Sequence, residues 1–86
     1  MGRKEKTYEK IMNGYSDSNI DFNDLRVVLE WLGFTCRIKG DHFIYFRKDI
    51  PDIINVQPLG NKAKAYQVKQ IRILFEKYRI GGRYYV

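Results

Sequence analysis

The chain has 86 residues, 44% of them hydrophobic, so it can form one small globular domain with a modest core. A single cysteine and a single histidine exclude an intrachain disulfide and a structural zinc site built from Cys and His ligands. The net charge of +6 is concentrated in residues 60–86, which carry seven Lys or Arg against one acid; this predicts a polyanionic partner or, as the alternative, a solvated helix face.

The first 20 residues are mostly polar and are predicted to form an N-terminal extension. Their apolar side chains follow the spacing i, i+3, i+4 and i+7, which is compatible with a short helix: Tyr8, Ile11, Met12 and Tyr15. Residues 13–19 are predicted to form a loop. The charged N-terminus has no apolar segment behind it, and no run approaches the roughly 18 apolar residues of a membrane span, so a cytoplasmic protein is predicted.

Residues 21–32 are predicted to form a helix. Asp21 is a favourable N-cap residue, and Gly33 stands where a glycine commonly ends a helix. The apolar residues between them repeat with helical period, which predicts one buried face: Phe22, Leu25, Val28, Leu29 and Leu32.

Three strands are predicted after this helix, over residues 34–39, 42–47 and 53–57. The pair Gly40-Asp41 is predicted to be a tight turn between the first two strands. Residues 49–52 are predicted to interrupt the pattern, and residues 59–64 to form a loop with two lysines. Cys36, in the first strand, is interpreted as a small buried apolar residue rather than a reactive thiol.

A second helix is predicted over residues 66–78, with a buried face made of Val68, Ile71, Leu74, Phe75 and Tyr78. Most large aromatic side chains are predicted to be core, among them Trp31, Tyr45, Phe46 and Tyr66. The order of elements predicts an α+β fold, in which two helices cover one face of a three-stranded antiparallel sheet, as in double-stranded-RNA-binding domains. An additional N-terminal helix is compatible with this α-β-β-β-α arrangement.

The only histidine, His42, follows the Gly-Asp turn at the start of the second strand. In RNA cleavage the nucleophile is the substrate's own 2′-hydroxyl, so the protein needs only a base or acid that works near pH 7 and cations around the phosphate. His42 is the candidate catalytic residue. The candidate cations are Lys39, Lys62, Lys64, Lys69 and Arg72. This chemistry requires no metal and no cofactor.

Four segments, LEWLGF, RIKGDHFIYF, INVQP and NKAKAYQVKQIR, together resemble the HicA family of toxins from toxin–antitoxin systems, over about residues 20–80. The family shows a helix that ends in a Gly-Phe pair, here Gly33-Phe34, and a Gly-Ser-His motif, here Gly40-Asp41-His42. The chain departs from the family pattern at Asp41, where serine is usual, and at Phe43, where many members have a histidine.

The resemblance implies a double-stranded-RNA-binding-like domain over residues 21–80, followed by a C-terminal tail of residues 81–86. It also implies ribonuclease activity on messenger RNA, a histidine as the catalytic group, and inhibition by a HicB-type antitoxin protein. Two alternatives stay open: a non-catalytic RNA-binding module of the same fold, and a protein-interaction domain whose charge is only a solvated face.

Overall fold

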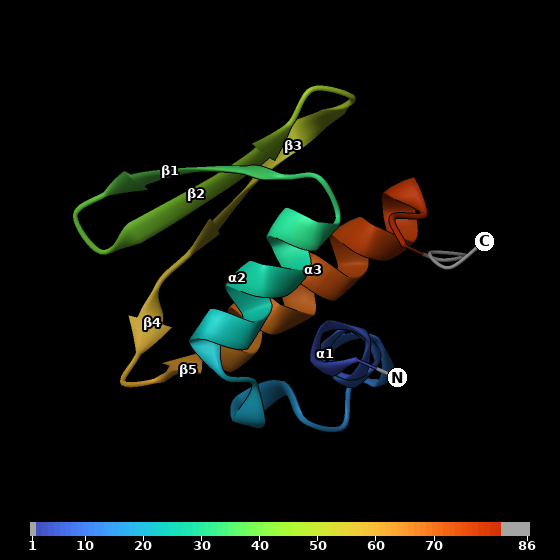
Figure 1. Ribbon diagram of the computed structural model, residues 1–86, viewed down its shortest axis with the longest axis vertical. Helices are drawn as coiled ribbons and strands as arrows, with labels where there is room; N and C mark the ends of the chain where they lie inside the picture. Colours follow the sequence, from blue (N-terminus) through green and yellow to red (C-terminus); the bar gives the residue numbers. More distant parts are fainter. Residues whose placement is uncertain (1, 82–86) are drawn as a thin grey trace.

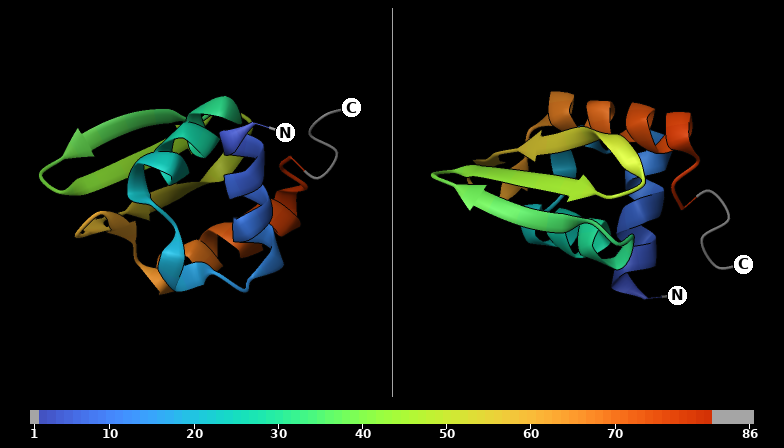
Figure 2. Two further views of the ribbon diagram at one scale, coloured as in Figure 1. Left: turned by 60° about the horizontal axis from the view of Figure 1, so that its bottom comes forward. Right: turned by 90° about the horizontal axis from the view of Figure 1, so that it is seen from above.

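The computed structural model describes residues 2–81 and has an α+β fold, in which helices and one antiparallel sheet form two layers (Figure 1). Its elements are α1 (Arg3–Asn13), a short 3-10 turn (Asp17–Asn19), α2 (Phe22–Trp31), β1 (Thr35–Lys39), β2 (His42–Arg47), β3 (Ile50–Val56), β4 (Pro58–Leu59), β5 (Lys62–Ala63) and α3 (Ala65–Tyr78). The strand order is β1-β2-β3, so the predicted α+β class and its three-stranded antiparallel sheet are confirmed. Seen from above, the sheet lies in front of α2 and α3 (Figure 2).

Helix α2 forms as predicted, and the local signals act as expected. The Asp21 side chain accepts a hydrogen bond of 3.0 Å from the Asp24 backbone N–H, which satisfies one of the free donors of the first turn. Gly33 has a φ of 92°, a left-handed conformation that glycine adopts without strain. The predicted apolar face is buried, apart from the half-buried Leu32 at its end.

Strands β1 and β2 form a hairpin around the predicted Gly40-Asp41 turn, with Lys39 directly opposite His42. Gly40 has a φ of 62°, in keeping with the requirement of such turns for left-handed residues. The tip of this hairpin extends beyond the helices (Figure 2). Ile38 is consequently exposed, although the sequence pattern predicted a half-buried strand throughout.

The predicted interruption at residues 49–52 is wrong, because β3 already begins at Ile50 and includes Pro51. Strand β3 is at the edge of the sheet, where a residue without a backbone N–H is tolerated. The register also shifts: Arg47 pairs with Ile50 and Tyr45 with Ile54, so three β3 residues stand opposite Phe46 alone. A proline that reads as a breaker in the sequence therefore lies in a bulged edge strand.

The predicted loop at residues 59–64 is partly a two-stranded ribbon, β4 and β5, turning at Gly60. The ribbon is held to the start of α2 by two backbone hydrogen bonds. Ala63 N–H donates to the Ile20 carbonyl at 2.8 Å, and Phe22 N–H donates to the Asn61 carbonyl at 2.9 Å. These contacts join segments about 40 residues apart and are not visible in local sequence patterns.

Helix α3 begins one residue earlier than predicted, and its predicted face packs into the core. Val68, Ile71 and Phe75 are buried, whereas Leu74 and Tyr78 are half-buried. The aromatic residues predicted to be core differ in burial: Tyr45 is fully buried, Trp31 and Phe46 are half-buried, and Tyr66 is exposed. Cys36 is half-buried against the core.

Helix α1 packs into the same hydrophobic core as α2 and α3. Tyr8 and Ile11 are buried, and the Tyr8 hydroxyl donates a 2.8 Å hydrogen bond to the Ile80 carbonyl near the other end of the chain. The apolar stripe predicted to include Tyr15 is wrong at that residue. Gly14 ends the helix in a left-handed conformation, and Tyr15 is 91% exposed. Residues 3–13 thus contribute directly to the packing of the domain.

Tyr45 is at the centre of the contact between the sheet and α2. The Arg26 guanidinium donates a 2.9 Å hydrogen bond to the Tyr45 hydroxyl, and burial raises the pKa of Tyr45 to about 12.

No helix within residues 2–81 has the length and apolar character needed to cross a membrane. The predicted C-terminal tail, apart from Gly81, lies outside the described residues.

Candidate active site

The face of the sheet opposite the helices carries three rows of side chains, one at each outward-facing residue of β2. Successive side chains of a strand point to opposite faces, so Phe43, Tyr45 and Arg47 face the helices while His42, Ile44 and Phe46 face outward. The first row is Lys39–His42, with Gln57 beside His42 just after β3. The second row is Arg37–Ile44–Asn55, and the third is Thr35–Phe46, where the register of β3 shifts. We call this surface the outer face.

His42 is at one end of the outer face, and its side chain is 47% exposed. Its two ring nitrogens have different partners on the β3 side. Nδ1 lies 3.1 Å from the Asn55 side-chain oxygen, and Nε2 lies 3.3 Å from the Gln57 side-chain nitrogen. The imidazole is therefore held in one orientation while it stays accessible to a ligand.

The orientation of the Gln57 amide assigns the tautomer of His42. Lys64 Nζ lies 3.1 Å from Gln57 Oε1, and an ammonium group can only donate, so the amide oxygen must face Lys64. The amide NH₂ then faces His42 and donates to Nε2, which must carry a lone pair. Nδ1 carries the proton and donates it to Asn55. In the neutral imidazole, this arrangement leaves the lone pair on Nε2.

Asp41 is the acidic group next to this base. One of its carboxylate oxygens lies 3.8 Å from His42 Nε2, and the other accepts from the Gln57 amide nitrogen at 3.5 Å. A carboxylate at this distance stabilises the imidazolium that forms when Nε2 takes up a proton. Serine, the usual residue in the HicA family, has no such charge.

The second departure from the family pattern lies on the other side of the strand. Phe43 faces the helices, where its ring packs edge-on against Phe22 at 5.0 Å between centroids, with the Arg26 guanidinium 4.7 Å from its centre. A histidine at position 43 would face the helices rather than the outer face. In this chain His42 is the residue that reaches the open surface.

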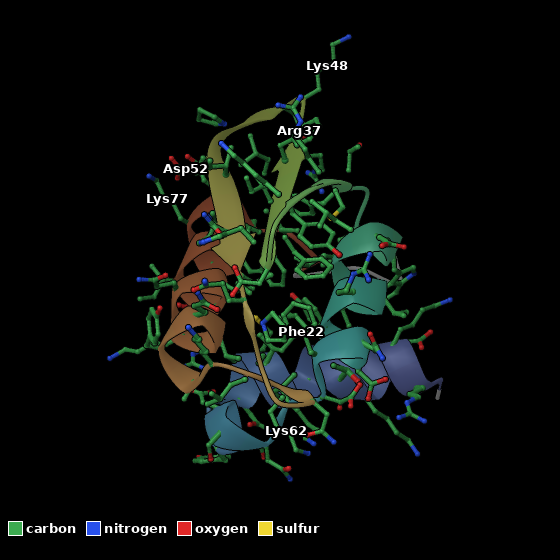
Figure 3. The ribbon with its side chains drawn as sticks, turned by 90° about the vertical axis from the view of Figure 1, so that its left-hand side faces the viewer. Phe22, Arg37, Lys48, Asp52, Lys62 and Lys77 are labelled. Carbon is green, nitrogen blue, oxygen red and sulfur yellow. The ribbon has the colours of Figure 1, made fainter. Side chains whose placement is uncertain are left out.

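The four candidate lysines differ in their relation to His42. Lys39 is exposed directly across the hairpin, Lys64 joins the same hydrogen-bond network through Gln57, and Lys69 is exposed on α3. Lys62 instead donates to Asn19 at 2.9 Å and lies beside Phe22, far from Arg37 and Lys48 (Figure 3). Lys39 and Lys64 are therefore the cations that the fold brings to His42.

Arg72 is engaged inside the fold. Its guanidinium donates to both Asp17 carboxylate oxygens, at 2.8 and 3.0 Å, and to the Ile11 carbonyl at 2.9 Å. Only 16% of its side chain is exposed, and the hydrogen bond with Asp17 raises the pKa of Arg72 above its ordinary value. These contacts tie α3 to α1 and the following turn, so Arg72 is not part of the RNA contact surface considered below.

Sequence reasoning did not single out Asn55 and Gln57. Both alternate with the buried Ile54 and Val56 in the segment INVQP, and this period-2 pattern places them together on the opposite face of the strand. This alternating pattern is a sequence signal that could have identified Asn55 and Gln57 as neighbours on one face. Their position beside His42 depends on the β2–β3 register, which only the fold defines.

Within residues 2–81, no three His, Cys, Asp or Glu side chains are close enough to hold a metal ion. No protein-family model, curated protein or solved structure matches the chain, so its likeness to the HicA family stays a prediction based on the segments quoted above.

Proposed function

We propose that the protein is a HicA-like endoribonuclease toxin that cleaves messenger RNA with His42 as its catalytic base. The observation that carries this proposal is the hydrogen-bond network of His42, in which Asn55 accepts from Nδ1 and Nε2, facing the Gln57 amide, keeps a lone pair. A base positioned in this way, on an open face beside Lys39 and Lys64, meets the requirements of 2′-hydroxyl activation.

The proposed reaction starts when the RNA 2′-hydroxyl replaces the Gln57 amide as the donor to His42 Nε2. Nε2 takes the hydroxyl proton while O2′ forms a bond to the adjacent phosphorus, and the P–O5′ bond breaks. The departing 5′-oxygen takes a proton from the imidazolium or from water. The products are a 2′,3′-cyclic phosphate and a 5′-hydroxyl end.

Neighbouring charges would stabilise the charged species of this reaction. Asp41 stabilises the transient imidazolium, and Lys39 and Lys64 stabilise the additional negative charge on the phosphate oxygens. The scheme requires no metal ion, so cleavage is expected to continue in the presence of a chelator. The test is a cleavage assay on purified RNA in which the end groups are identified; a 3′-phosphate formed directly by water attack would contradict the scheme.

The first prediction concerns the lysines. Replacing Lys39, Lys64 and Lys69 together by alanine is expected to weaken RNA binding for all sequences, because each lysine releases a counterion when it contacts a phosphate. The slope of log affinity against log salt should fall by about 0.7 per contact, and so by about 2 in the triple variant. Titrations at several salt concentrations measure this slope.

Binding is the appropriate measurement here, because Lys64 also orients Gln57 and its loss would alter cleavage for a second reason. Lys6→Ala on α1 is the matched control, since it removes an exposed lysine from a helix that packs away from the sheet. It should leave the slope unchanged. An unchanged slope in the triple variant would remove these lysines from the RNA contact.

The runner-up is a non-catalytic RNA-binding module of the same fold. It is favoured by the extent of the outer face, which is larger than a single catalytic group requires. In this reading the wild-type protein binds RNA without cleaving it, His42 is a turn residue, and its loss leaves binding unchanged. Cleavage by the wild-type protein, compared with that by the His42 variant discussed below, therefore separates the two functions.

The second prediction concerns the antitoxin. We propose that a small acidic HicB-type protein covers His42 and the Lys62–Lys69 region, because a basic RNA-binding face is complementary to an acidic inhibitor. Since His42 is the only histidine, a histidine-selective acylating reagent reports on this residue alone in an untagged protein. The product of the adjacent gene should protect His42 from the reagent and abolish cleavage. A complex that inhibits while His42 still reacts would contradict direct occlusion.

A further inference from the structure

The outer face has an apolar region that is left uncovered by the helices of residues 2–81. Ile44 and Phe46 are half-buried there, and Ile53 is 62% exposed. Together with Arg37, they line a shallow hollow of about 330 Å³. This volume is at the lower end of the range for small-molecule sites, so the hollow fits a planar group the size of a base rather than a large folded ligand.

Phe46 is the central side chain of this region. Its ring also lines a second hollow, of about 570 Å³, together with Gly33, Thr35, Arg47, Lys48 and Asp49. On the first side the Arg37 guanidinium lies 5.8 Å from the ring centroid, within the range of a cation–π contact. An aromatic ring that borders two hollows and has a cation over it is a suitable stacking surface for a base.

The charges around this region favour an anionic ligand. Arg37 and Lys48 extend at the end of the molecule formed by the sheet, away from α1 (Figure 3), and Lys39 lies in the His42 row. Two nearby acids already have partners. Asp49 pairs with Arg47 at 2.7 Å, and Asp52 accepts from Tyr78 at 2.9 Å and lies 3.5 Å from Lys77. Asp41, beside His42, is the remaining acid of the hairpin tip.

We propose that the outer face is a binding platform for unpaired nucleotides, in which a base stacks on Phe46 beside Ile44 and Arg37 contacts the stacked base or its phosphate. This inference deepens the proposed function and rests on it, since it identifies the substrate as single-stranded RNA and gives its path to His42. Duplex RNA hides the faces of its bases, so it offers nothing to an apolar hollow, whereas a single strand exposes both bases and phosphates.

The geometry connects the platform to the catalytic base. His42 and Phe46 are on the same side of β2 and four residues apart, a distance of about 13 Å along a strand. A short stretch of single strand spans this distance, with Arg37 and Ile44 in the row between them. The strand would therefore pass from the stacked base over the middle row to the phosphate at His42.

The test compares a single-stranded oligonucleotide with a hairpin duplex of the same composition, by fluorescence anisotropy at one fixed salt concentration. Phe46→Ala is expected to weaken single-strand binding by about 5- to 150-fold, the range for losing one aromatic stacking contact, and to leave duplex binding unchanged. Phe46→Trp should restore single-strand binding, because indole also stacks. Tyr15→Ala, which removes an exposed aromatic side chain from the loop after α1, is the matched control.

A second measurement needs no variant. Photo-crosslinking of a 4-thiouridine oligonucleotide to the wild-type protein should label the peptide that contains Phe46. Absence of this label, or an equal loss of single-strand and duplex binding in Phe46→Ala, would overturn the platform. Concentration-dependent dimerisation, or binding of an acidic protein, that disappears in Phe46→Ala while RNA binding persists would assign the face to that partner instead.

The platform and the catalytic proposal fail in different ways. Cleavage that requires His42 but not Phe46 would leave the nuclease without this platform. Selective loss of single-strand binding in Phe46→Ala, in a protein that cleaves nothing, would leave the platform on a binding module.

Discussion

His42→Ala is expected to lower the rate of RNA cleavage by about 10²–10⁴-fold, which is the usual contribution of a general acid or base. RNA affinity should be largely kept, because Lys39, Lys64 and the outer face are unchanged. The variant should fold normally, since the His42 side chain is half-exposed and its hydrogen bonds are at the edge of the sheet. Single-turnover cleavage and equilibrium binding, measured on the same RNA, separate the two effects.

Asp41→Ser is the matched variant for this experiment, because it changes the neighbouring residue to the one usual in the HicA family. It removes the carboxylate 3.8 Å from Nε2 but keeps the base and its Asn55 contact. Activity should therefore remain, because the base that takes the 2′-hydroxyl proton is still present. Full cleavage by His42→Ala would remove His42 from the mechanism, whereas RNA binding by a wild-type protein that cleaves nothing would favour the binding module.

Ile11→Ala is expected to lower the free energy of unfolding by about 2–5 kcal/mol, as for other large-to-small changes at fully buried positions. Ile11 is on α1, inside the segment that the sequence predicts as an N-terminal extension, yet its side chain is completely buried in the common core. For a domain of this size, such a loss is a large part of the total stability. Urea denaturation monitored by circular dichroism measures it.

Tyr15→Ala is the control, because it removes a larger apolar side chain from the same N-terminal segment at an exposed position. Its effect should be within about 0.5 kcal/mol, as for most surface changes. Similar small effects for both variants would mean that α1 adds little to the fold. The expected contrast would instead show that residues 3–13 are needed for the stability of the domain that carries His42.

The sequence predicts an element most reliably where the residues that determine it are close together in the chain. The N-cap Asp21, the apolar period of α2 and the left-handed Gly33 act within one helix, and the Gly40-Asp41 turn acts within one hairpin. The interruption predicted around Pro51 was wrong, because a proline is excluded only from strand positions whose backbone N–H must donate a hydrogen bond. Whether a strand is central or at the edge is decided by its neighbours in the sheet.

The same distinction applies to the residues with proposed functions. Arg72 counts as a free cation in the sequence, but Asp17, 55 residues earlier, binds it when α3 packs beside the N-terminal segments. Phe46 and Tyr45 are adjacent aromatic residues, and strand alternation sends one to the outer face and the other to the core. Composition and charge do not reveal these differences, because they depend on which face of an element is covered.

The sequence by itself determined the α+β class, the position of α2 and α3, the hairpin, and a single histidine at the start of its second strand. These follow from local periodicity, capping and turn residues. Only the tertiary structure decided that Asn55, 13 residues after His42, and Gln57, 15 residues after it, hold the two ring nitrogens, and that Lys64 orients Gln57. The reason is physical: hydrogen bonds between strands exist only in one register, and that register is set by the packing of the whole sheet on the helices.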